Sequence, residues 1–147
     1  MSTFTEPTAT RGSAPSHSPP DVHYAPGIGL ARKLGWFSVG LGLTEMLAPR
    51  LIARMTGVRS ETLVQGFGLR EFVVGVGILA SARPTNWIWA RVAGDAMDLA
   101  VLGDAIVESD CPVMRDNAIG ATLAVAGVTA LDVVCGLQLT AAETLEG

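Results

Sequence analysis

The residues of this chain best suited to do chemistry are charged side chains that interrupt otherwise apolar stretches. Carboxylates can exchange protons or bind cations, and guanidinium groups pair with carboxylates. Ionisable groups at membrane depth are costly, so they usually face one another or a watery cavity and are candidate functional residues by default. Six such residues form the predicted intramembrane network: Arg70, Glu71, Arg91, Asp95, Asp98 and Asp132.

The charges within residues 87–107 have helical spacing. Arg91, Asp95 and Asp98 follow the i, i+4, i+7 pattern of one stripe on a helix. Asp104 falls on roughly the opposite face, near the end of the segment, where it can reach the membrane surface. The stripe therefore points three ionisable groups in one direction.

Counting residues from the predicted turns gives the depth of each charge. Arg70 lies about eleven residues before one turn and Asp98 about twelve after it, so both are roughly 17 Å deep at a rise of 1.5 Å per residue. We therefore predict a layer in which Arg70 pairs with Asp98, with Asp95 within reach. The same count from the last loop predicts a second layer of Arg91 with Asp132.

The predicted interior carries more negative than positive charge. Two arginines face four carboxylates, and an unpaired ionised carboxylate is very costly in a low dielectric. Acids could be protonated, a cation or basic ligand could bind, or Arg32 and Lys33 could reach inward. The alternative to a functional site is a satisfied polar network that only fixes helix pairing, and the sequence leaves these possibilities open.

Catalysis and cofactor binding are not expected. Asp95 and Asp98 are neighbours on a helix and could work as an acid–base pair, but aspartates beside an arginine such as Arg91 are more often ion-paired. The Gly75/Gly77 pair matches the dinucleotide fingerprint only loosely, because the strand and helix start that this fingerprint requires are missing. We predict no catalytic residue, no metal ligand and no cofactor.

Four apolar segments must position these charges. Each is long enough to cross a bilayer core, and they cover residues 28–47, 62–80, 87–107 and 117–139. Between the first two, residues 49–61 mix apolar side chains with arginines and resemble a short amphipathic piece at the membrane surface. The predicted fold is all-α, a four-transmembrane-helix bundle over residues 27–140.

The segments outside this bundle are polar. Residues 1–26 are rich in Ser, Thr and Pro and lack apolar periodicity, so we expect a disordered tail. Residues 141–147 form a short acidic tail. Within the bundle, residues 40–45 (Gly-Leu-Gly-Leu-Thr-Glu) and 66–71 (Gly-Phe-Gly-Leu-Arg-Glu) echo each other weakly, which suggests two related helices.

The composition agrees with a lipid environment. Hydrophobic residues make up 49% of the 147 residues, the mean hydropathy is +0.41, and the 17 glycines suit close helix packing in lipid. A soluble helical bundle is the competing class, but three of the four segments are apolar nearly all round. The net charge of -4 has no basic block, so we expect no nucleic-acid partner. Besides lipid, a second copy of the chain or a partner membrane protein could pack on pairs of small residues four apart, namely Ala90/Gly94, Gly120/Ala124 and Ala126/Ala130.

Four stretches carry a family resemblance: residues 31–38 (Ala-Arg-Lys-Leu-Gly-Trp-Phe-Ser), 47–50 (Leu-Ala-Pro-Arg), 66–71, and 89–95 (Trp-Ala-Arg-Val-Ala-Gly-Asp). Together they resemble a group of small bacterial integral-membrane proteins of unknown function with a DoxX-like four-helix architecture. The resemblance covers roughly residues 28–139. It implies four spans in the bacterial inner membrane, and it implies no activity and no assigned site.

The sequence thus predicts a multi-pass membrane protein whose buried Arg/Asp/Glu network either only organises the bundle or also binds a small ligand or a partner. A small proton-coupled transporter or carrier, in which the surplus carboxylates titrate, is the alternative. A membrane enzyme that uses Asp95 and Asp98 is a third.

Overall fold

The computed structural model describes residues 27–146, which form five helices and no strand. The helices are α1 (Ile28–Leu47), α2 (Pro49–Thr56), α3 (Glu61–Ala80), α4 (Thr85–Glu108) and α5 (Pro112–Glu146). The all-α prediction is confirmed. The tail predicted over residues 1–26 lies outside the described residues.

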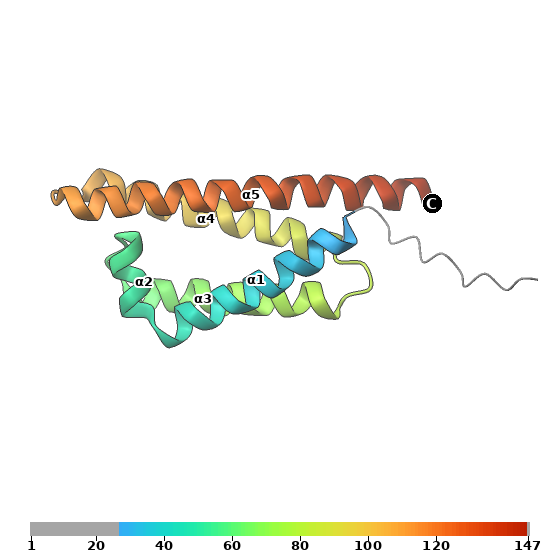
Figure 1. Ribbon diagram of the computed structural model, residues 1–147, viewed down its shortest axis with the longest axis horizontal. Helices are drawn as coiled ribbons and strands as arrows, with labels where there is room; N and C mark the ends of the chain where they lie inside the picture. Colours follow the sequence, from blue (N-terminus) through green and yellow to red (C-terminus); the bar gives the residue numbers. More distant parts are fainter. Residues whose placement is uncertain (1–26, 147) are drawn as a thin grey trace, which may run out of the picture.

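The four long helices form two pairs, α1 with α3 and α4 with α5, and the pairs meet mainly through α3 and α4. Figure 1 shows the path: α2 caps one end of the molecule, while the start of α1, the turn between α3 and α4, and the end of α5 lie at the other end. The chain therefore runs the length of the molecule four times.

Glycines set the close approach of α1 and α3. A Cβ added at Gly42 would lie 2.5 Å from the backbone oxygen of Gly68, and a Cβ at Gly75 would lie 2.8 Å from that of Gly35. The backbones therefore touch at two places one heptad apart, as small residues allow. Gly42 and Gly68 occupy equivalent positions in the two similar stretches, residues 40–45 and 66–71. The two helices therefore cross where each has this glycine.

Local sequence explains several helix ends. Ser60 caps α3 by accepting a hydrogen bond from the Leu63 backbone nitrogen at 3.3 Å, and Pro49 occupies the first turn of α2. Gly57, with a φ of 74°, ends α2 in the left-handed conformation. The predicted amphipathic piece is therefore a true helix of two turns.

The last helix is longer than the sequence analysis predicted. It begins at Pro112 instead of residue 117, and residues 141–146, set apart above as an acidic tail, are its final turns. Hydropathy marks where an apolar environment would end, whereas a helix can continue through polar residues that are good helix formers. Pro112 fits the first turn, and no further Pro or Gly follows Gly136 before Gly147.

Two helical segments, Glu61–Ala80 and Pro112–Leu145, are long and apolar enough to cross a membrane.

Two clusters of buried apolar side chains lie towards opposite ends of the bundle, with the charged residues between them along α3 and α4. The first cluster contains Ala31, Leu34, Val74, Ile78, Ile88, Cys135 and Leu139. The second contains Ala53, Val58, Val64 and Leu102.

Candidate functional site

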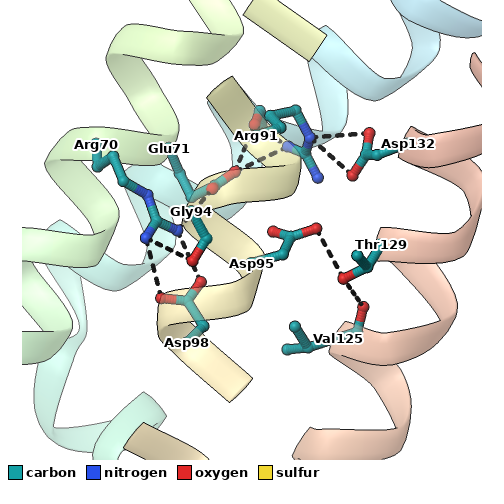
Figure 2. Close-up of polar contacts among 10 residues, drawn as sticks. Arg70, Glu71, Arg91, Gly94, Asp95, Asp98, Val125, Thr129 and Asp132 are labelled. Carbon is teal, nitrogen blue, oxygen red and sulfur yellow. Dashed lines mark hydrogen bonds and ion pairs between the residues drawn. The ribbon is translucent and has the colours of Figure 1, made fainter. Parts of the chain in front are cut away.

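Arg91 lies at the centre of the polar network, with 1% of its surface exposed. Its Nε donates hydrogen bonds to both carboxylate oxygens of Asp132 on α5, each at 3.1 Å. Its Nη1 donates to Glu71 Oε2 on α3 at 2.8 Å and also contacts the Ser38 hydroxyl on α1. A single side chain on α4 therefore contacts each of the other three long helices. Figure 2 shows Arg91 between Glu71 and Asp132.

Arg70 forms a second set of contacts towards α4. Its Nη1 and Nη2 donate to the two oxygens of Asp98 at 3.1 and 2.7 Å, in the paired geometry that makes arginine–carboxylate contacts strong. Nη1 also donates to the Gly94 carbonyl at 3.0 Å. The Arg70 Cζ lies 5.6 Å from the centre of the Phe67 ring, so an aromatic face covers the cation.

Glu71 connects the two arginines. Its Oε1 accepts a hydrogen bond from Arg70 Nη2 at 2.9 Å, while Oε2 accepts from Arg91 and from the Ser38 hydroxyl. Both carboxylate oxygens of this buried residue are therefore satisfied. Because breaking a buried ion pair leaves an uncompensated charge, the contacts of Glu71 hold α1, α3 and α4 in register.

The two predicted ion-pair layers are both present. Arg70 pairs with Asp98, and Arg91 pairs with Asp132, as the depth count required. The salt bridges from Glu71 to each arginine join the two layers into one network.

Asp95 occupies a different position from the one expected. Instead of approaching Arg70, it lies against α5, where the Thr129 hydroxyl donates to Asp95 Oδ2 at 3.0 Å. The 100° turn between successive helix positions rotates Asp95 away from Asp98, towards α5. Asp95 is 4% exposed, and within residues 27–146 it forms no ion pair with an arginine. Asp104 is exposed, as predicted.

Three carboxylates converge at the end of the network nearest α2. Glu71, Asp95 and Asp98 each place an oxygen within 4.8 Å of the other two, a spacing that can surround a cation. Arg70 engages both oxygens of Asp98. That engagement speaks against an Asp95/Asp98 acid–base pair, because such a pair needs both groups free to exchange protons.

A cavity of about 530 Å³ adjoins the converging carboxylates. Every helix contributes to its wall, which is mostly apolar. The charged groups on the wall are Glu45, Glu71, Arg91, Asp95, Asp98 and Asp116, and apolar lining includes Phe37, Leu41, Ile52, Met55, Val64, Phe67, Val101, Leu102, Ala121 and Val125. Its volume lies in the range of small-molecule sites.

Sequence analysis missed three members of this site: Ser38, Glu45 and Thr129. Glu45 lines the cavity and has one buried carboxylate oxygen, Oε2, without a hydrogen-bond partner. A signal for the first two was available, because Gly35, Ser38, Gly42 and Glu45 follow the i, i+3, i+7, i+10 spacing of a single helix face. A weaker signal existed for Thr129, which lies three residues before Asp132 and therefore on the same helix face.

Comparison of this chain with protein-family models, with curated proteins and with solved structures found no match.

Proposed function

We propose that this chain is a membrane protein of the bacterial inner membrane that crosses the bilayer four times, through α1, α3, α4 and α5. Its residues are distributed differently from those of a water-soluble bundle, since a charged network lies inside beside the two apolar clusters. Large apolar side chains are exposed on all four helices, among them Leu43, Val73, Met97 and Leu131. Such a surface would associate in water and is solvated by lipid tails.

The short helix α2 fits the membrane surface in this arrangement. Leu51 and Met55 are exposed one turn apart, next to the exposed Arg50 and Arg54. Apolar side chains beside cations on one short helix are typical of an interfacial helix, whose arginines contact headgroups. In membrane fractionation, the full chain should stay in the pellet after alkaline carbonate extraction. A chain that stays soluble without detergent would contradict four spans.

Within the membrane, the function that the geometry supports best is binding of a small ligand. The observation that carries this proposal is the cavity beside Glu71, Asp95 and Asp98. A network that served only to fix helix pairing would be expected to exclude empty space, because interiors pack densely. Here a ligand-sized space with apolar walls meets converging polar groups, the combination typical of binding sites.

Filling the cavity tests this proposal. Ala121 lines the cavity, whereas Ala126 lies on the exposed side of the same helix, outside the cavity wall. Ala121→Phe should abolish the binding of any small amphiphile that stabilises the purified protein, and Ala126→Phe should leave it unchanged. The amphiphiles tested would all have an octyl chain and would differ in headgroup, which would be cationic, anionic or neutral. If no member stabilises the protein in an Ala121-dependent way, the binding proposal fails.

A proton-coupled carrier is the second candidate, and the excess of carboxylates favours it. Two arginines, Arg70 and Arg91, stand against six buried or cavity-lining acids: Glu45, Glu71, Asp95, Asp98, Asp116 and Asp132. A carrier would acidify or alkalinise reconstituted vesicles when its substrate is added, and Asp98→Asn should remain folded yet lose the pH-dependent flux. If the substrate binds and no proton movement is seen, the carrier proposal is wrong and the protein only binds its ligand.

A further inference from the structure

The charge balance of the cavity wall gives the sign of the ligand. Arg70 and Arg91 are the cations that reach the network, while Arg32 and Lys33 are exposed on α1 and do not enter it. The acids outnumber these two guanidinium groups. Since buried charge of one sign is costly, the cavity favours an occupant that carries positive charge.

The hydrogen bonds show where that charge fits. Asp98 and Glu71 each have both oxygens engaged by arginines, whereas Asp95 pairs with no arginine of the described residues and has the Thr129 hydroxyl and the neighbouring Asp132 carboxyl as its polar partners. Asp95 is more than nine-tenths buried, and it lies on the cavity wall. Glu45 on α1 also lines the cavity and keeps a buried oxygen, Oε2, without a partner. The unmatched acceptors of the site therefore belong to Asp95 and Glu45.

The apolar lining distinguishes an organic cation from a metal ion. A bare divalent ion would take oxygen ligands from all sides and would need no space beyond them. Most of the lining consists of side chains such as Ile52, Val101 and Leu102, which offer no ligand atom to a metal. They do offer contact to a hydrocarbon, and an ammonium group has several N–H donors for separate carboxylate oxygens.

We propose that the ligand of this cavity is an amphiphilic organic cation, with a protonated amine held by Asp95 and Glu45 beside the acidic cluster and a hydrocarbon body against the apolar wall. This inference rests on the proposed binding function and specifies its ligand class. The cavity volume of about 530 Å³ accommodates a body of drug-like size.

The experiment uses the full chain in lipid nanodiscs and isothermal titration with four probes: octylammonium, octanol, octanoate and Mg²⁺. Octylammonium should bind, and Asp95→Asn should weaken that binding by about tenfold or more, as expected for the loss of a charge-assisted contact. Asp104→Asn is the matched control, because Asp104 lies on α4 but is exposed; it should leave binding unchanged. If Asp95→Asn does not fold, Glu45→Gln provides the same comparison.

The outcomes separate this inference from the proposed function. If octanol or octanoate binds as tightly as octylammonium, and Ala121→Phe abolishes that binding, the cavity is a binding site and the cationic ligand class is wrong. Binding of Mg²⁺ alone, lost in Asp95→Asn, would also overturn the organic cation. Octylammonium binding that is equal in Asp95→Asn, Glu45→Gln and the unmodified protein would refute the assigned contacts. If no probe binds, both proposals fall.

Discussion

Replacement of Arg91 by methionine is the most direct test of the network. Methionine keeps an unbranched apolar chain that extends about as far as the arginine Nε, and it removes every donor. Asp132 and Glu71 would each lose a partner, and both are buried. Because Arg91 contacts α1, α3 and α5 at once, its removal also loosens the contact between the two helix pairs.

The size of the effect follows from the burial of the two carboxylates. Removing one partner of a buried ion pair usually costs about 3–5 kcal/mol, because the other charge is left uncompensated. The exposed pair of Arg50 with Glu61, whose side chains are 81% and 50% exposed, gives the comparison. Exposed pairs contribute at most about 1 kcal/mol. We therefore expect Arg91→Met to lower the midpoint of thermal unfolding by about 10 °C or more, and Arg50→Met by a few degrees at most.

The buried Cys135 provides the assay. A thiol-reactive fluorescent dye labels a buried cysteine only after unfolding, and Cys111→Ser removes the exposed thiol that would otherwise react first. All variants would be compared in this background, in one detergent, with the dye signal followed during heating.

A second substitution makes the result specific. Asp132→Asn removes the charge that Arg91→Met leaves unpaired, so the double variant should unfold at a higher temperature than Arg91→Met alone. The reasoning is refuted if Arg91→Met is no more destabilising than Arg50→Met, or if the two substitutions at Arg91 and Asp132 simply add.

Three further predictions use the same assay. Gly42→Ala should destabilise the protein by about 1–3 kcal/mol, because the added methyl group meets backbone that cannot move aside, whereas Gly40→Ala, with open space around it, should be tolerated. Asp98→Asn should cost about 1.5–3 kcal/mol by removing a charged hydrogen-bond partner of Arg70, and exchanging the two residues as Arg70→Asp with Asp98→Arg should restore part of it. Gly94→Ala would place a methyl group 2.7 Å from the Arg70 Cζ, so it should destabilise the protein by displacing Arg70 from Asp98. Most of this loss of stability should disappear when Asp98 is already replaced by Asn. Additive losses would contradict a common effect on the Arg70–Asp98 pair.

The helical content and the main ion pairs could be predicted from the sequence because both follow from simple counting. Arg70 and Asp98 lie at equal distances from the same turn, and antiparallel helices bring equal distances level. The same count placed Arg91 level with Asp132. These inferences needed only the helical rise and the positions of the breaks.

The rotation of each helix about its axis was harder to predict. Asp95 differs from Asp98 by less than one turn, yet it faces α5 and not Arg70. The direction depends on how α4 packs between α3 and α5, which is set by contacts such as the one between Gly94 and the Arg70 guanidinium. The cavity could not be predicted either. It depends on how the side chains of five helices pack against one another, and no single segment determines that packing.

The length of α5 has a consequence for how the protein is seated. Its 35 residues span about 52 Å, whereas the hydrocarbon core is about 30 Å thick. A tilt of about 20° lengthens the crossing to only about 32 Å. In the proposed membrane arrangement, about 13 residues of this helix would therefore extend beyond the lipid tails, divided between its two ends, with the exposed Arg115 and Asp116 near one end and the exposed Glu143 near the other.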